Sequence, residues 1–207
     1  LFRILLGAGT LILPESNLSL EQMINKFRVT HLSLVPTQLY RLLRDNHDRE
    51  ILKNLKAVLI GGAPIPENLI KQAKRLKIPL ALTYGLTEMG SQVATSQPGF
   101  HQVKTLSYRE IKISENNEIL VKGRTLFKGY IRSDFVHLPL NNEGWFCTGD
   151  LGHLTPKGTL TVTGRNDNMF ISGGENIQPE EIEHCLCQIK GIEQAIVVGV
   201  PCEKYGA

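Results

Sequence analysis

The chain has 207 residues, of which 42% are hydrophobic and 21% charged, and its formal net charge is +3. This composition is typical of a globular protein with a buried core, and it excludes a disordered or fibrous chain. No apolar run reaches about 18 residues, so we expect no membrane span. The opening LFRILLGAGTLIL is broken by Arg3 and by glycines and lacks the charged leader of a signal peptide. We interpret it as a core segment.

One local run of basic residues, KQAKRLK at 71–77, could face an anion but is more often a solvated helix face. No basic patch is interleaved with aromatic residues, so we expect no nucleic-acid partner. The cysteines form neither a CxxC pair nor a zinc pattern, and we interpret them as reduced, buried thiols of a cytoplasmic protein. They are Cys147, Cys185, Cys187 and Cys202.

The first part of the chain alternates strand-like and helix-like patterns, which favours a parallel sheet with right-handed crossovers and flanking helices. Ser19 and Gln22 resemble a capping box that opens a helix over Met23, Ile24 and Phe27. The expected elements that follow are a strand at 30–35, a helix from Pro36 with Leu39, Leu42 and Leu43 inward, a strand at 57–60, a helix from Pro66 with Leu69, Ile70, Ala73 and Leu76 inward, and a strand at 78–82.

From about residue 100 the pattern changes to short, glycine-punctuated strand candidates, which predicts an antiparallel, barrel-like segment. These candidates are REIKI, EILVKG, FKGYI, GWFCTGD and GTLTVTG. A glycine-rich turn SGGEN, a helix from Pro179 with Ile182, Leu186 and Ile189 on one face, and a strand at 195–200 complete the expected order. We place a domain boundary near Asp167. The chain starts without methionine and stops soon after an apolar segment, so we expect a piece of a longer protein.

Two predicted strand ends carry segments suited to a ligand. GGAP (61–64) follows the strand at 57–60, and TYGLTE (83–88) follows the strand at 78–82. Ligands of open parallel sheets bind at the carboxyl ends of the strands, so we expect a site there. The GGAP backbone could lie against a planar ligand, or its glycines could serve only a turn that needs positive φ. Both interpretations stay open.

The residue types of TYGLTE suit a nucleotide with a metal ion. Tyr84 offers a stacking face, Gly85 permits close approach, Thr87 can bond a phosphate oxygen, and Glu88 can hold a hard cation. Magnesium at phosphates usually takes one or two carboxylates and completes its shell with water and substrate oxygens. One glutamate is therefore sufficient.

Further polar residues follow in GWFCTGD and TGRNDN. Asp150 could accept both hydroxyls of a ribose or could be a solvated turn aspartate. Arg165 could bind nucleotide oxygens bidentately. Asp167 could be an ordinary turn or cap residue.

Taken together, the order and spacing of these motifs resemble the adenylate-forming superfamily of acyl-CoA synthetases, luciferases and peptide-synthetase adenylation domains. The matching pieces are GGAPIP, TYGLTE, EILVKG…GY, GWFCTGDLG and GRNDNMFISGGENIQPEEIE. Within the superfamily, GGAPIPENLI, TYGLTEMGSQV and FISGGENIQPEEIE look most like the o-succinylbenzoate–CoA ligase subfamily. The resemblance implies residues 1–166 as the C-terminal part of the large AMP-binding domain and 167–207 as the start of a small mobile domain.

The resemblance also implies an activity, with ATP, Mg²⁺ and coenzyme A as substrates or cofactors. A carboxylate would be activated as an acyl-adenylate and then transferred to CoA, most simply as o-succinylbenzoyl-CoA for menaquinone biosynthesis. Thr87 would contact the α-phosphate, Glu88 would hold magnesium, Asp167 would be the hinge, and Gly173 and Gly174 would line the pantetheine tunnel. The implied AMP- and ATP-binding residues are Gly61, Gly62, Ala63, Pro64, Tyr84, Gly85, Leu86, Thr87, Asp150 and Arg165.

The residues after Glu88 should line the acyl pocket. Gly90 and Ser91 are small enough to admit an aromatic ring, and Ser91 or Gln92 could bond a second carboxylate or a keto group. A fatty-acid pocket would be apolar throughout.

The sequence departs from the superfamily pattern in several places. The Ser/Thr/Gly-rich phosphate loop, the aromatic or histidine gate of the acyl pocket and the adenylation lysine have no counterpart in these residues. HQVKTLSYRE (101–110) stands where the superfamily usually has a glycine-containing turn. The fragment alone is therefore expected to be inactive. The alternatives are another aryl- or fatty-acyl-CoA ligase, a peptide-synthetase adenylation domain, and a non-catalytic nucleotide-binding remnant; the oligomeric state stays open.

Overall fold

The computed structural model describes residues 4, 7–13 and 17–202. A five-stranded sheet of order β1-β2-β3-β4-β5 joins three parallel strands to two antiparallel ones. Its strands are β1 (His31–Leu34), β2 (Ala57–Ile60), β3 (Leu80–Leu86), β4 (Ser91–Thr95) and β5 (Lys104–Thr105). The helices of this part are α2 (Leu20–Phe27), α3 (Pro36–Leu42), α4 (Asn46–Lys53) and α5 (Glu67–Arg75), with a 3₁₀ turn η1 (Thr87–Met89) after β3.

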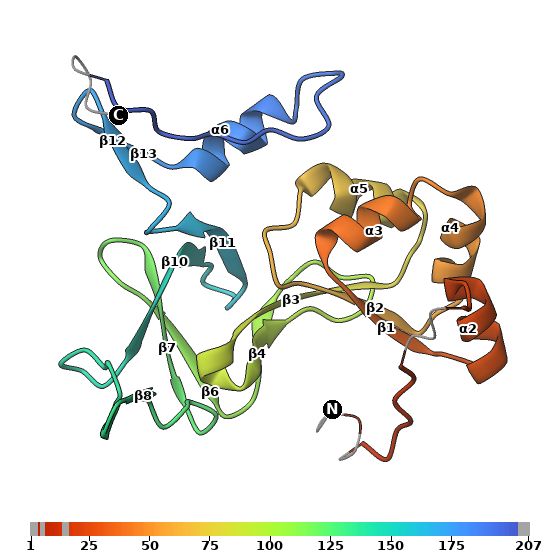
Figure 1. The fold of residues 1–207 in the computed structure, drawn as a ribbon, viewed down its shortest axis with the longest axis horizontal. Coiled ribbons are helices and arrows are strands. Elements are labelled where there is room, and N and C mark those ends of the chain that lie inside the picture. Colours follow the sequence, from red (N-terminus) through yellow and green to blue (C-terminus); the bar gives the residue numbers. More distant parts are fainter. Residues whose placement is uncertain (1–3, 5–6, 14–16, 203–207) are drawn as a thin grey trace.

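A second, antiparallel sheet of order β11-β10-β7-β6 follows, together with two separate hairpins. The sheet consists of β6 (Arg109–Ile113), β7 (Glu118–Gly123), β10 (Phe146–Leu154) and β11 (Leu160–Arg165). The hairpins are β8 (Tyr130–Arg132) with β9 (Phe135–His137) and β12 (Phe170–Ser172) with β13 (Glu175–Ile177), and α6 (Pro179–Leu186) follows the second. In Figure 1 the hairpin β12–β13 and α6 lie away from the hairpin β8. The predicted class, a parallel layer followed by a β-rich segment and a small α+β part, is confirmed.

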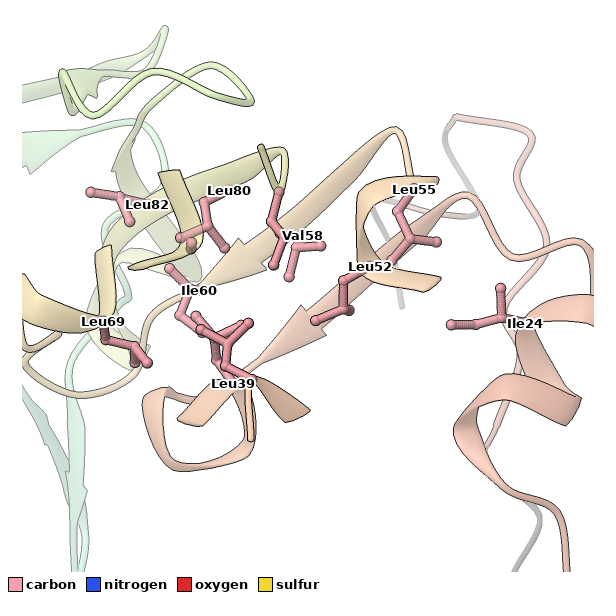
Figure 2. Close-up of a cluster of buried hydrophobic side chains, with 12 residues drawn as sticks. Ile24, Leu39, Leu52, Leu55, Val58, Ile60, Leu69, Leu80 and Leu82 are labelled. Carbon is pink, nitrogen blue, oxygen red and sulfur yellow. The ribbon is translucent and has the colours of Figure 1, made fainter. Parts of the chain in front are cut away.

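The helices α3, α4 and α5 lie along one side of the parallel strands (Figure 1) and bury an aliphatic core. Leu39 of α3 and Ile60 of β2 are fully inaccessible to solvent and lie beside each other (Figure 2). The predicted capping box is confirmed, because Gln22 N–H donates to Ser19 Oγ at 3.2 Å and Ser19 N–H to Gln22 Oε1 at 2.8 Å. A second core lies between β4 and the antiparallel sheet and contains Met89, Val93, Ala94, Ile119, Val121, Phe146 and Leu160.

Several sequence predictions were wrong in detail. The strand predicted at 78–82 runs on to Leu86, since its second half pairs with β4. Helix α4 was not predicted; Asp45 caps it by accepting from the N–H groups of His47 and Asp48. The predicted strand at 195–200 has no regular secondary structure and joins no ladder of the described chain, and its Val197 N–H instead donates to Glu183 Oε1 at 2.9 Å.

Burial differs from expectation at both ends of the sequence and at the cysteines. The opening segment is described only in part, and its Leu11 and Leu13 are exposed instead of forming a core. Helix α6 ends at Leu186, so Ile189 lies beyond it and is also exposed. The cysteines are free, as predicted, but none is buried. The basic run at 71–77 is a solvated helix face, as predicted, since its lysines and arginine are exposed.

The loop at 101–110 contains an unusual backbone position. Tyr108 has φ of 64°, a left-handed conformation that glycine adopts without a steric penalty. This is the segment in which the superfamily usually has a glycine. The side chain of Tyr108 packs over the Arg124 guanidinium, with 5.4 Å between the guanidinium carbon and the ring centre.

Candidate functional site

The strand β3 positions the site because it changes partners along its length. Its first half pairs in parallel with β2, and its second half pairs antiparallel with β4, with an irregular register after Tyr84. A side chain at Gly85 would place its Cβ 2.1 Å from the Ser91 carbonyl oxygen. The close approach of β3 to β4 therefore requires glycine at position 85, whether or not a ligand binds there. The Ser91 backbone has φ of 136°, which is rare for a residue with a side chain.

A cavity of about 380 Å³ opens between the end of β3 and strand β10, and we name it the Asp150 cavity. It brings together residues that are far apart in the sequence and carry both polar and aromatic groups. Its lining consists of Leu86, Glu88, Glu118, Tyr130, Phe146, Cys147, Thr148, Gly149, Asp150 and Arg165.

Asp150 is the centre of the polar network in this cavity. The Tyr84 hydroxyl donates to Asp150 Oδ2 at 2.7 Å, and Arg165 Nη1 donates to Asp150 Oδ1 at 3.0 Å. Arg165 also donates to both oxygens of Asp167, at 2.7 and 3.0 Å, in the two-pronged geometry typical of guanidinium–carboxylate pairs. Each Asp150 oxygen accepts one of these bonds and retains a further lone pair for a ligand hydroxyl.

The electrostatics of the network follow from burial and charge. Burial, aided by the nearby Asp150 carboxylate, raises the pKa of Tyr84 well above its ordinary value, so the phenol stays protonated as a donor. The hydrogen bond to Asp167 raises the pKa of Arg165 and, from the other side, lowers the pKa of Asp167. Arg165 is about half exposed and Asp150 is largely covered, so one edge of the network faces solvent.

The backbone of β10 holds Asp150 in place through an irregularity in the strand. The register of β10 against β7 shifts between Cys147 and Leu151, and Gly149 has φ of 74°. The freed Gly149 N–H donates to Glu118 Oε1 at 2.9 Å, and the Asp150 N–H donates to Thr148 Oγ1 at 3.0 Å. The Thr-Gly-Asp turn is therefore a bulge inside a strand, braced by a neighbouring carboxylate.

Glu88 enters the same cavity from η1. Its Oε1 accepts a 2.7 Å hydrogen bond from the Tyr130 hydroxyl, which raises the pKa of that phenol. The Glu88 backbone carbonyl accepts from Phe127 N–H at 2.7 Å.

A second, smaller cavity of about 170 Å³ is lined by residues of β1, β2, β3 and β4 and of the turn after β2, and we name it the Gly61 cavity. A Cβ on Gly61 would lie 2.7 Å from the Thr83 carbonyl oxygen, and Gly62 has φ of 81°. The GGAP glycines thus serve a tight turn and also line a hollow. The lining is Ser33, Leu34, Leu59, Gly61, Gly62, Thr83, Ser91 and Gln92.

The structure divides the candidate residues between these two cavities. The Asp150 cavity takes Leu86, Glu88, Asp150 and Arg165, with Tyr84 bonded to its centre. The Gly61 cavity is lined by two residues predicted to bind the nucleotide, Gly61 and Gly62, and by two residues predicted to line the acyl pocket, Ser91 and Gln92. The two linings meet at the β3–β4 pairing, where Leu86 of the first is the register partner of Ser91 of the second.

Other candidates lie outside both linings. Ala63, Pro64, Thr87 and Gly90 are exposed. Gly173 and Gly174 form the turn between β12 and β13, with φ of 61° and 87°, instead of lying within a strand.

Sequence reasoning assigned no role to Glu118, Tyr130 or Thr148, which all line the Asp150 cavity. The signal was present for all three, because Glu118 and Tyr130 lie in EILVKG…GY and Thr148 lies in GWFCTGDLG, two of the pieces that carried the resemblance. The proximity of the first two to Glu88 and Gly149 depends on strand pairing and could not be derived from spacing.

The carboxylates of the Asp150 cavity are of the type that a magnesium ion requires. Glu88, Glu118 and Asp150 supply hard carboxylate oxygens at one cavity. Across the described ranges, no group of three or more His, Cys, Asp or Glu side chains is arranged to hold a metal alone. Glu88 therefore fits a magnesium ion whose remaining ligands come from nucleotide phosphates and water.

Comparison with known proteins identifies the class. The family model described as AMP-binding enzyme matches residues 1–131, and the chain belongs to this family. It is 40% identical to the 2-succinylbenzoate–CoA ligase of Escherichia coli over 97% of the chain and 43% of that protein. It is 42% identical to the Salmonella typhimurium enzyme of the same name, again over 97% of the chain and 43% of the relative.

Solved structures similar to this chain belong to enzymes of the same kind as these relatives. The Bacillus subtilis o-succinylbenzoate CoA synthetase in complex with the acyl-adenylate OSB-AMP has a TM-score of 0.81 at 32% identity, over 99% of this chain and 46% of that one. The same enzyme in complex with ATP and magnesium has a TM-score of 0.80 at 31% identity, with the same coverage. The chain thus spans less than half the length of these relatives. Among the residues that the structure describes, no helix is long and apolar enough to cross a membrane.

Proposed function

We propose that the full-length protein containing this chain is an ATP-dependent acid–thiol ligase that makes o-succinylbenzoyl-CoA, a step of menaquinone biosynthesis. The observation that carries the proposal is the Asp150 network, in which Tyr84 and Arg165 converge on one carboxylate beside Glu88. The names of the relatives give the substrate, and their greater length is the reason for assigning the activity to the full-length protein.

The proposed chemistry has two steps. In the first, a substrate carboxylate oxygen attacks the α-phosphorus of ATP, and the bond to the β-phosphate oxygen breaks, releasing pyrophosphate. In the second, the CoA thiol loses its proton and its sulfur attacks the acyl carbon, releasing AMP and leaving a thioester. Activation is needed because a free carboxylate is anionic and has a poor leaving group.

Different residues of the Asp150 cavity would bind different parts of the nucleotide. Asp150 would accept the ribose hydroxyls while Tyr84 and Arg165 fix its orientation. Arg165 would also contact nucleotide oxygens on its exposed edge, and Tyr84 would offer its ring to adenine. A magnesium ion held by Glu88 would neutralise phosphate charge as pyrophosphate leaves. Thr87, next to Glu88, would contact the α-phosphate.

The Gly61 cavity would extend this site toward the acyl group. Gly61 and Gly62 leave a side-chain-free wall, and Ser91 and Gln92 of β4 supply polar groups to the same cavity. Such a mixed wall suits a ring that carries a second carboxylate or a keto group. A fatty acyl chain would leave these polar groups without partners.

The proposed domain boundary falls between 166 and 167, with Asp167 as hinge and Gly173 and Gly174 lining the CoA path. Two features support this division. Strands β12 and β13 join neither large sheet. The segment from 167 onward meets Arg44, just beyond the end of α3, and helix α5 through exposed polar pairs, Glu193 with Arg44 and His184 with Glu67. Contacts of this kind suit parts that separate and re-dock. The free, unpaired cysteines suit a reducing compartment, and we propose the cytoplasm.

The test is a substrate panel on the full-length protein, following pyrophosphate release with o-succinylbenzoate, coumarate, benzoate and octanoate. The proposal expects the highest kcat/KM with o-succinylbenzoate and CoA-dependent release of AMP. A preference for octanoate or for another aryl acid would contradict the substrate. Absence of pyrophosphate release with every acid would support a non-catalytic nucleotide-binding protein instead.

A further inference from the structure

Tyr130 stands out because it contacts the proposed metal ligand although it lies 42 positions away in the sequence. Its hydroxyl donates to Glu88 Oε1 at 2.7 Å, and both side chains line the Asp150 cavity. None of the roles assigned to the nucleotide residues involves this tyrosine.

The segment that carries Tyr130 is fixed against Glu88 by more than one contact. Phe127 N–H donates to the Glu88 backbone carbonyl at 2.7 Å. The Phe127 ring packs edge-on against Tyr130, with centres 4.8 Å apart, and against Phe146 of the second core, at 5.5 Å. A hydrophobic anchor therefore sets the position of the phenol, and the phenol sets one carboxylate oxygen.

The backbone beside Tyr130 is also restricted. Gly129 has φ of 133°, and a Cβ there would lie 2.7 Å from the His137 carbonyl oxygen across the hairpin. The close pairing of β8 with β9 thus restricts the backbone from which the Tyr130 side chain extends.

The second carboxylate oxygen of Glu88 is the one that can bind a further ligand. Glu88 Oε2 has no hydrogen bond or ion pair with any residue that the structure describes. A glutamate side chain loses substantial rotamer entropy when it is immobilised, and a residue that fixes it beforehand removes that loss from metal binding. Partners of metal ligands typically change metal affinity about 10- to 100-fold when they are removed.

We propose that Tyr130 is a positioning residue: its hydroxyl fixes the Glu88 carboxylate so that Oε2 remains available to a divalent cation bound with nucleotide. This inference rests on the proposed function, since it takes Glu88 as the metal ligand. It adds a residue that does not touch the nucleotide in its assigned role and acts only through Glu88.

The experiment measures cation binding directly in the full-length protein. Mn²⁺ binding in the presence of α,β-methylene-ATP is followed by electron paramagnetic resonance for the wild type, Tyr130→Phe and Glu88→Gln. Tyr130→Phe keeps the ring against Phe127 and removes only the donor, so we expect about tenfold weaker Mn²⁺ binding. The matched control is Tyr108→Phe, whose hydroxyl has no hydrogen-bond partner in the described chain; it should bind Mn²⁺ like the wild type.

A second readout separates positioning from loss of structure. Binding of AMP without metal should be the same in Tyr130→Phe and the wild type, whereas a damaged cavity would weaken it as well. Equal Mn²⁺ affinity in Tyr130→Phe and the wild type would overturn the inference, as would parallel loss of metal-free AMP binding.

The two proposals fail in different ways. A wild-type protein that binds Mn²⁺ with the nucleotide but releases no pyrophosphate contradicts the ligase function and leaves Tyr130 to be judged by the binding data. Undiminished Mn²⁺ affinity in Glu88→Gln contradicts the positioning role even if ligase activity is found.

Discussion

The helix-covered parallel strands and the Asp150 cavity differ in what fills them. Between α3, α5 and β2 the buried side chains are aliphatic, with Leu39 and Ile60 fully inaccessible. Around Asp150 the contacts are hydrogen bonds between groups that are partly open to solvent. The aliphatic core fixes the positions of the strands. The ends of these strands then bring the charged groups around Asp150 together. Variants in the two regions should therefore separate stability from ligand binding.

The largest effect on stability is expected in the aliphatic core. Leu39→Ala leaves a cavity at a site with no solvent access and should lower the free energy of unfolding by about 2–5 kcal/mol. Urea denaturation measures this loss. AMP affinity of the protein that remains folded should be unchanged, and a marked loss of affinity would show that the two regions are not separable.

The next effect concerns ligand binding without loss of the fold. Asp150→Asn removes the charge that orients Tyr84 and Arg165, and should weaken AMP binding about 10- to 100-fold, as expected for a charged hydrogen-bonding group. Calorimetric titration with AMP measures the affinity.

The matched control for this variant is Asp134→Asn, at an exposed aspartate in the turn between β8 and β9. It should bind AMP like the wild type. Equal AMP affinity in Asp150→Asn and Asp134→Asn would show that Asp150 does not bind the nucleotide.

A smaller, pH-dependent effect is expected at Tyr84. Its pKa is raised in the folded state, mainly by burial, so the folded protein holds this proton more tightly than the unfolded chain does. The stabilisation is complete below pH about 10, the ordinary phenol value, and is lost as the pH rises above it. Urea midpoints measured between pH 8 and 11 should therefore fall less steeply for Tyr84→Phe than for the wild type. Parallel curves would contradict this account.

The smallest effect is expected at the contact that crosses the proposed domain boundary. Glu193 meets Arg44 at 3.6 Å and accepts from the Tyr40 hydroxyl, and the side chains of Glu193 and Arg44 are exposed. Glu193→Gln should leave the unfolding midpoint unchanged, because exposed ion pairs contribute little. It should instead raise the hydrogen-exchange rate of α6. A clear loss of stability would mean that the boundary is wrongly drawn.

The helices and strands of the parallel layer were predicted well because each depends on residues that are close together in the sequence. The capping box at Ser19, Pro36 at the first turn of α3 and the apolar run at 57–60 each act within a few residues. Helix α4 was missed because its burial is slight, with Leu52 as its buried residue. The strand at 195–200 was wrong because apolar alternation predicts an extended chain but cannot supply a neighbouring strand.

The site was predictable in its residues but not in its grouping. Order along the chain indicated Tyr84, Glu88, Asp150 and Arg165, and all four meet at one cavity or its central carboxylate. The placement of Gly61 and Gly62 with Ser91 depended on the register between β3 and β4. The Tyr130–Glu88 bond depended on the packing of Phe127, which no spacing rule contains.

Hydrogen exchange with and without ATP and Mg²⁺ tests the central claim most directly, because it reports on both regions in one measurement. We predict slower exchange at the amides of 84–88 and 147–150 on nucleotide binding, with unchanged exchange in α4 at 46–53. Protection that spares 147–150 would contradict the assignment of the nucleotide to the Asp150 cavity.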